Sequence, residues 1–229
     1  MNTKGEAMLI AFDMDDTLYK EREYVFSGRR AVARYFSEKT GLPETQLTGA
    51  MEGYGPVGPE AFDALYRVLE PHGILMEEIV QVYRAHRPEI SLDPDAEALL
   101  QRLKDAGMHL ALITDGRPAG QRMKFEALGL GRFFEPDSVF ISGETGGSKN
   151  TPLPFRMGEE RFPEARRRIY VGDNMAKDFR NARMRGWQTV MLADPEKKNI
   201  FPQMIGEAAP EYRPDMVVFR LSDAFPQTI

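Results

Sequence analysis

The sequence predicts an α/β protein with a parallel sheet at its centre and a helical domain inserted after the first strand. Short, continuously apolar runs recur along the chain, as expected for strands that are buried on both faces. Segments with helical spacing alternate with these runs, and this alternation is typical of a Rossmann-like sheet with helices on both faces. One long stretch without a convincing strand interrupts the alternation. That stretch predicts the insert.

The predicted strands are the apolar runs themselves. The first runs from Met8 to Phe12 and ends abruptly at Asp13. The later ones run from His109 to Ile113, Val139 to Ile141, Ile169 to Val171, Thr189 to Leu192 and Met216 to Phe219.

The predicted helices divide between the sheet and the insert. Those between the strands run from Pro94 to Ala106, with Asp93 as N-cap and Gly107 as stop, from Ala119 to Leu128, and from Met175 to Arg185. Those of the insert run from Gly28 to Lys39, Pro59 to Leu69 and Met76 to His86. We therefore assign residues 1–18 and 93–229 to the α/β core and residues 19–92 to the helical insert.

Composition excludes several classes of function. The 229 residues include no cysteine, which removes disulfides, thiolate metal sites and cysteine nucleophiles. The net charge of -5 provides no electrostatic footprint for nucleic acid or an anionic membrane. The segment Met1 to Ala7 lacks the apolar core of a signal peptide, and no apolar run is long enough to span a bilayer. We expect a cytoplasmic protein without nucleic-acid or membrane partners, and the oligomeric state stays open.

Polar clusters follow the first two core strands. The run Asp13-Met14-Asp15-Asp16-Thr17 can direct two carboxylates into one pocket if the chain turns there, although acidic pairs are usually solvated. The run Thr114-Asp115-Gly116 precedes Pro118 at the first turn of a helix. A hydroxyl, free N–H groups and a helix N-terminus together can bind a phosphate-sized anion. On its own, this run also fits an ordinary capped turn.

Two further clusters lie later in the chain. Lys149 ends a glycine-rich stretch that starts at Gly143, and a lone lysine in such a loop is usually solvated. Gly172-Asp173-Asn174 follows a predicted strand, with Asp178 a few residues on. Carboxylate oxygens at a strand end suit Mg²⁺, which needs few protein ligands and keeps several waters. The same residues would also fit a capped helix.

The four clusters together are more specific than any one of them. In order and spacing, they resemble the four sequence motifs of the haloacid dehalogenase superfamily. The residues that carry the resemblance are Asp13 to Thr17, Thr114, Lys149, and Gly172-Asp173 with Asp178. The resemblance extends from Met8 to about Phe219, and the helical insert resembles the mainly helical cap domain of that family.

The resemblance implies Mg²⁺-dependent phosphoryl transfer with Asp13 as nucleophile. A carboxylate and a phosphate dianion repel each other by about 4 kcal/mol per unit-charge pair at an effective dielectric of 20, so a cation must offset the repulsion. The implied metal ligands are Asp13, Asp173 and the backbone carbonyl of Asp15. Asp178 would not touch the metal directly but would order a bound water or Lys149.

The remaining motif residues take roles at the phosphate. Thr114, the backbone N–H of Asp115, and Lys149 would bind the phosphoryl oxygens. Asp15 would be the general acid for the leaving alcohol and then the base for water. The true dehalogenases of this family lack an acid at that place, because halide leaves without a proton. The presence of Asp15 therefore favours phosphoryl transfer. One departure is that Lys149 is followed by Asn150-Thr151-Pro152, whereas family members often have Pro directly after the lysine.

The function predicted on this basis is a phosphatase that hydrolyses a small phosphomonoester through an aspartyl-phosphate on Asp13. A sugar phosphomutase of the same superfamily remains an alternative, as does a non-catalytic member that binds a phosphorylated ligand or a protein. The expected partner is a small phosphorylated metabolite whose identity cannot be read from the sequence. Tyr19, Arg22 and Arg117 lie near the motifs and could contact the leaving group.

Overall fold

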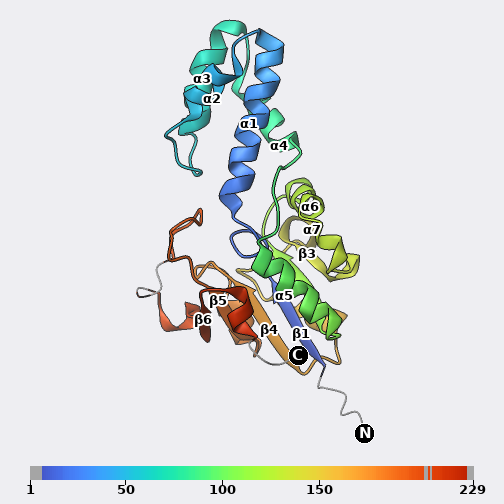
Figure 1. Cartoon of the computed structure of the whole chain (residues 1–229). Coiled ribbons are helices and arrows are strands. Elements are labelled where there is room, and N and C mark those ends of the chain that lie inside the picture. The colour runs from blue at the N-terminus through green and yellow to red at the C-terminus, as the bar shows by residue number, and fades with distance from the viewer. Residues whose placement is uncertain (1–6, 204–205, 207, 226–229) are drawn as a thin grey trace. The chain divides into compact units, whose positions relative to one another are not determined.

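The computed structural model describes residues 7–203, 206 and 208–225 and divides into two compact units. One unit comprises the chain up to Lys20 and from Ser91 onward, and the other is Glu21–Ile90. The first contains the whole sheet, and the second is helical (Figure 1).

The sheet of the first unit has six parallel strands in the order β3-β2-β1-β4-β5-β6. The strands are β1 (Met8–Phe12), β2 (His109–Thr114), β3 (Val139–Ile141), β4 (Arg167–Gly172), β5 (Gln188–Leu192) and β6 (Met216–Val218). The six apolar runs identified in the sequence are therefore the six strands. The α/β fold with a Rossmann-like parallel sheet is confirmed.

Strand β1 lies in the middle of this order, between β2 and β4. The chain builds outward from β1 through β2 to β3, and then crosses back to add β4, β5 and β6 on the other side. This reversal is a topological switch point, and ligands of open α/β sheets bind beyond the carboxyl ends of the strands at such a point. The topology alone places a candidate site where β1 and β4 end.

Helices cover the two faces of the sheet. They are α5 (Pro94–Asp105), α6 (Pro118–Ala127), α7 (Ser142–Thr145), α8 (Leu153–Arg161) and α9 (Arg180–Met184). Short 3-10 turns lie at Leu130–Arg132, Pro136–Ser138, Pro210–Tyr212 and Leu221–Ala224. Asp93 caps α5 by accepting a hydrogen bond from the backbone N–H of Asp95, as the sequence predicted.

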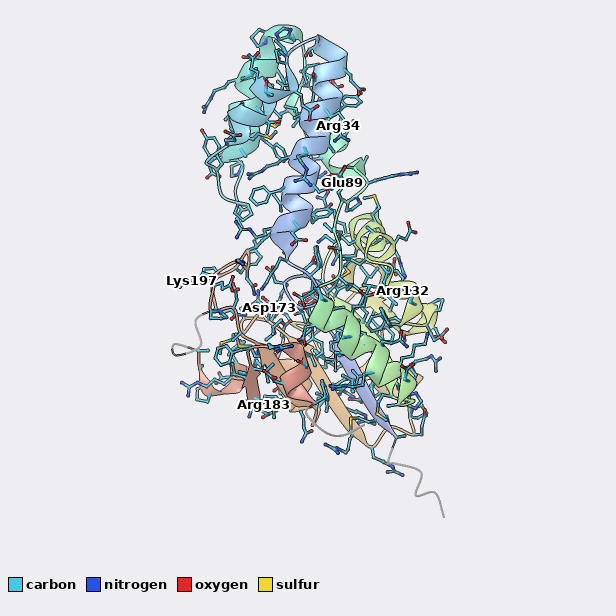
Figure 2. The ribbon with its side chains drawn as sticks, in the orientation of Figure 1. Arg34, Glu89, Arg132, Asp173, Arg183 and Lys197 are labelled. Atoms are coloured by element: carbon cyan, nitrogen blue, oxygen red, sulfur yellow. The ribbon has the colours of Figure 1, made fainter. Side chains whose placement is uncertain are left out.

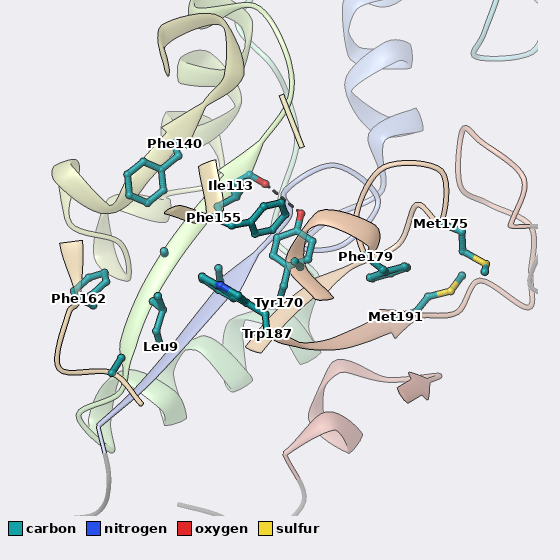
Figure 3. Close-up of a cluster of buried hydrophobic side chains, with 14 residues drawn as sticks. Leu9, Ile113, Phe140, Phe155, Phe162, Tyr170, Met175, Phe179, Trp187 and Met191 are labelled. Carbon is teal, nitrogen blue, oxygen red and sulfur yellow. Dashed lines mark hydrogen bonds between the residues drawn. The ribbon is translucent and has the colours of Figure 1, made fainter. Parts of the chain in front are cut away.

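Alternate residues of the central strand contribute to cores on opposite faces. Leu9 and Ala11 belong to a buried cluster with Phe155 of α8 and Phe179, next to α9 (Figure 3). Phe12, which points to the other face, packs its ring against Phe134 at 6.5 Å. Because both faces are covered, charged side chains in this sheet are confined to the strand ends.

The helical unit contains α1 (Glu21–Thr40), α2 (Glu44–Met51), α3 (Glu60–Leu69) and α4 (Met76–Ala85), with a 3-10 turn at Glu70–His72. Its core is formed by apolar side chains from all four helices. Buried Arg29 of α1 donates hydrogen bonds to the carbonyls of Tyr54 and Gly55, which ties down the loop between α2 and α3. Among the described helices, none combines the length and the apolar character that crossing a membrane requires.

The structure corrects two predicted helices and adds others. The helix expected from Gly28 to Lys39 is α1, which begins earlier, at Glu21, and ends at Thr40. The helix expected from Met175 to Arg185 begins only at Arg180. Asp178 accepts hydrogen bonds from the backbone N–H groups of Asp173 and Asn174, so the preceding segment forms a loop around that carboxylate. Helices α2, α7 and α8 were not predicted from the sequence, because their apolar residues are too few to show a clear period.

The first prediction concerns the core behind the site. Phe155 is fully buried and contacts the rings of Tyr170 and Trp187 edge to face. Phe155→Ala should lower the free energy of unfolding by about 3–5 kcal/mol through lost burial and a cavity, measured by urea denaturation. Phe219→Ala, at a side chain that is 67% exposed, should change it by less than about 0.5 kcal/mol. Equal effects of the two changes would contradict this core.

Candidate active site

Three adjacent strands bring the predicted motifs to one edge of the sheet. Asp13 directly follows β1, Asp173 directly follows β4, and Thr114 is the last residue of β2. Strand β1 pairs with β2 on one side and with β4 on the other. Figure 2 shows Asp173 at this edge. The switch point and the acidic motifs therefore coincide.

A buried group of charged side chains forms the centre of the site. The ammonium of Lys149 lies 2.8 Å from Asp13 Oδ2 and 2.6 Å from Asp178 Oδ1, and the lysine side chain is completely buried. Asp13, Asp173 and Asp178 each offer a carboxylate oxygen within 4.8 Å of the others. Sequence motifs that are far apart in the chain thus meet within one small volume.

Burial makes negative charge costly here. It raises the pKa of Asp13 to about 6, against the opposing attraction of Lys149. Burial also raises the pKa of Asp173 well above its usual value, and the neighbouring carboxylates of Asp178 and Asp13 add to this effect. Burial lowers the pKa of Lys149, but Asp13 and Asp178 outweigh it and keep the lysine firmly charged.

Asp178 organises the backbone of the fourth motif. Its Oδ2 atom accepts from the N–H groups of Asp173 at 3.1 Å and Asn174 at 2.7 Å. Gly172 is required beside it, because a Cβ atom on Gly172 would lie 2.5 Å from Asp178 Oδ2. Gly172, Asp173 and Asp178 therefore form a single closely packed turn.

The loop that carries Lys149 is fixed by hydrogen bonds from both sides. Asp115 Oδ1 accepts from the backbone N–H of Lys149 at 3.1 Å, and Asn181 Nδ2 donates to its carbonyl at 3.0 Å. The carboxylate of Asp115 thus has a structural contact, where the sequence suggested only a backbone contribution. These contacts bring Lys149 into the site although Asn150 and Thr151 separate it from Pro152.

Asp15 lies in a separate, partly buried network. Its Oδ1 atom is 2.7 Å from Lys124 Nζ and 2.5 Å from the hydroxyl of Tyr19, and its Oδ2 atom accepts from Gln121 Nε2 at 2.9 Å. Burial raises the pKa of Asp15, but Lys124, Tyr19 and Gln121 together lower it below its usual value. Gln121 also donates to Thr114 Oγ1 at 2.6 Å.

The loop after β5 reaches the acidic residues from another side. Asn199 Nδ2 donates to Asp173 Oδ2 at 2.8 Å, and Gln203 Nε2 donates to the Asp173 carbonyl at 3.0 Å. Asp16, whose φ of 57° is uncommon for a non-glycine residue, accepts from the N–H of Ile200 at 2.8 Å. Asp16 is thus a buried structural residue. Figure 2 labels Lys197 in the same loop.

Sequence reasoning missed Gln121, Lys124, Asn199 and Gln203. The first two lie on the same face of α6, three residues apart, and are buried although polar. No sequence pattern separates them from solvated residues of a surface helix. Asn199 and Gln203 belong to an irregular loop with no period to interpret.

The side chains fit a divalent cation. If all are ionised, the carboxylates of Asp13, Asp173 and Asp178 and the ammonium of Lys149 leave two net negative charges in a buried volume. The raised pKa values of Asp13 and Asp173 reflect the cost of that charge. Hard carboxylate oxygens in such an arrangement suit Mg²⁺.

Three buried carboxylates and a buried lysine lie at the switch point of a parallel sheet, an arrangement that fits a hydrolytic α/β enzyme. Comparison with known proteins agrees. The model of the haloacid dehalogenase-like hydrolase family matches residues 7–184. The chain belongs to this family, and the prediction of a phosphatase-type member of the superfamily is confirmed.

Two curated relatives and one solved structure illustrate the similarity. A glyceraldehyde 3-phosphate phosphatase of Methanopyrus kandleri is 30% identical over 207 residues, covering 85% of this chain and 87% of the relative. A phosphoserine phosphatase of Thermus thermophilus is 36% identical over 149 residues, covering 65% of this chain and 55% of the relative. The magnesium-bound putative hydrolase YfnB of Bacillus subtilis has a TM-score of 0.62 at 19% identity, covering 96% of this chain and 98% of that one. That last likeness shows the fold.

The second prediction follows from the burial of Asp13. The pKa of Asp13 is about 6 in the folded protein and 3.8 in the unfolded chain. The protein therefore has its full stability with respect to Asp13 below pH 3.8, and loses part of it as the pH rises through 6 and the buried carboxyl ionises. At higher pH, the penalty is on the order of 3 kcal/mol. With chelator present, Asp13→Asn should therefore raise the thermal unfolding midpoint relative to wild type, by an amount that grows from about pH 4 to about pH 6 and then levels off. A difference that does not vary with pH would contradict this.

Proposed function

We propose that this enzyme is a Mg²⁺-dependent phosphatase that hydrolyses a small phosphomonoester through an aspartyl-phosphate on Asp13. The observation that carries the proposal is the convergence of Asp13, Asp173 and Asp178 on the buried ammonium of Lys149. Phosphate monoesters hydrolyse extremely slowly in water, and a carboxylate nucleophile divides the reaction into two easier steps.

Asp13, Asp173 and the backbone carbonyl of Asp15 would hold Mg²⁺, with Asp178 ordering the backbone and Lys149 around them. When bound, Mg²⁺ would offset the repulsion between the nucleophile and the phosphate and polarise the phosphoryl oxygens. The raised pKa of Asp13 and Asp173 supports a requirement for such a cation.

The protein's own groups would then guide phosphoryl transfer. An oxygen of Asp13 attacks phosphorus, while Lys149 and the hydroxyl of Thr114 hold phosphoryl oxygens in line for the attack. Asp15, protonated in the substrate complex, gives its proton to the leaving alcohol. It next takes a proton from the water that attacks the aspartyl-phosphate. The lowered pKa of Asp15 suits that second step.

The substrate class is supported by the relatives. Both are named for small phosphorylated metabolites, glyceraldehyde 3-phosphate and phosphoserine. We infer that this chain acts on a small phosphorylated metabolite as well. We further infer that the helical unit Glu21–Ile90 is the cap, whose side chains select the leaving group.

The third prediction tests the activity itself. The purified protein should hydrolyse p-nitrophenyl phosphate with Mg²⁺ and lose this activity with chelator. Asp13→Asn should lower kcat at least about 1000-fold, because it removes the nucleophile. Asp137→Asn, at an exposed aspartate, is the matched control and should retain activity. Undiminished turnover by Asp13→Asn would exclude the proposed intermediate.

The fourth prediction separates hydrolysis from mutase chemistry. Incubation with a panel of sugar phosphates and small phosphorylated metabolites should release inorganic phosphate in equal amount to the dephosphorylated product, measured by phosphate assay and mass spectrometry. Recovery of an isomeric sugar phosphate without free phosphate would identify a mutase instead.

A further inference from the structure

Helix α6 presents two buried polar side chains to the site, and the reaction scheme above does not use either one. Gln121 and Lys124 are 4% and 5% exposed, although both are polar and lie on a helix of the outer layer. Burying an amide and an ammonium is costly unless each forms good hydrogen bonds. Both of them direct their nitrogen atoms to Asp15.

The contacts fix both oxygens of the Asp15 carboxylate. Lys124 Nζ donates to Oδ1 at 2.7 Å, and Gln121 Nε2 donates to Oδ2 at 2.9 Å. Since these donors lie three residues apart on one helix face, the helix holds them at a set separation. A carboxylate bound through both oxygens cannot rotate freely about its Cβ–Cγ bond.

Gln121 also determines the direction of the Thr114 proton. Gln121 Nε2 donates to Asp15 Oδ2, so the NH₂ end of the Gln121 amide faces Asp15. The same nitrogen lies 2.6 Å from Thr114 Oγ1, and its second proton is donated there. The Thr114 hydroxyl is then an acceptor toward Gln121 and keeps its own proton for another acceptor. In the proposed mechanism, that acceptor is a phosphoryl oxygen.

We propose that Gln121 and Lys124 are positioning residues, which hold Asp15 in place as proton donor and aim the Thr114 hydroxyl at the phosphate. The inference rests on the proposed phosphatase function. The two residues have different roles. Lys124 contacts Asp15 and acts on proton transfer, whereas Gln121 contacts both Asp15 and Thr114 and so also acts on phosphate binding.

The test compares substrates whose leaving groups differ in their need for a proton. An alkyl phosphate requires protonation of its alkoxide, whereas p-nitrophenolate leaves without it. For each variant, kcat/KM is measured with both substrates, together with the inhibition constant of inorganic phosphate. Circular dichroism and the unfolding midpoint verify that each variant is folded.

Lys124→Met should lower kcat/KM for the alkyl phosphate at least about 100-fold but for the aryl phosphate less than about 10-fold, in the range typical of general acid catalysis. Its phosphate inhibition constant should stay unchanged, and Lys124→Arg should restore part of the loss. Gln121→Glu, which replaces the donor by an acceptor, should lower kcat/KM for both substrates and raise the phosphate inhibition constant. Arg122→Met removes an exposed ion pair with Glu144 from the same helix and should change none of these quantities.

Asp15→Asn distinguishes failure of the acid role of Asp15 from failure of the positioning roles of Lys124 and Gln121. Suppose that Asp15→Asn lowers kcat/KM only for the alkyl phosphate, while Lys124→Met lowers kcat/KM equally for both substrates. The acid role of Asp15 then stands, and the positioning role of Lys124 is wrong. If Gln121→Glu leaves the phosphate inhibition constant unchanged, its contact with Thr114 has no part in phosphate binding. If Asp15→Asn itself lowers kcat/KM equally for both substrates, Asp15 is not the general acid, and the positioning roles inferred for Gln121 and Lys124 are wrong as well.

Discussion

The burial of Lys149 among acidic side chains is the interaction on which the rest of the site depends. An ammonium with no exposed surface is stable only beside negative charge, and Asp13 and Asp178 lie within 2.8 Å of it. Asp173 adds a third carboxylate, so one lysine cannot balance the cluster. The imbalance that raises the pKa of Asp13 and Asp173 is also what makes the cluster a suitable site for a cation and for a phosphate dianion beside it.

The fold places these charged groups at the ends of strands, away from the apolar faces of the sheet. Both faces of the sheet are filled with apolar side chains, so charged groups are accepted only where strands end. The crossing of the chain on either side of β1 places three such ends together. Hydrogen bonds to the backbone then fix two of the motifs: Asp178 accepts from the N–H of Asp173, and Asp115 accepts from the N–H of Lys149. Hydrogen bonds to the backbone thus hold the charged side chains of the site in place.

Much of this arrangement follows from local sequence, and the rest depends on tertiary contacts. Each of the six strands contains a continuous apolar run, and Asp13 and Asp173 come directly after two of the strands, so both could be recognised. Helix α9 was placed too early because side-chain capping by Asp178 competes with helix formation. Gln121 could not be recognised, because its role depends on Asp15, which is 106 positions away in the chain. Contacts of that kind leave no periodic signal in a single sequence.

The central claim is that Asp13 accepts the phosphoryl group beside a cation held by the neighbouring acidic residues. The most direct measurement is a crystal structure with Mg²⁺ and beryllium fluoride, a stable mimic of the phosphoryl group. The account predicts beryllium bonded to a carboxylate oxygen of Asp13, with the metal contacting Asp13 and Asp173, and Lys149 contacting fluorine. Beryllium bonded to another residue, or a metal bound away from Asp13 and Asp173, would contradict it.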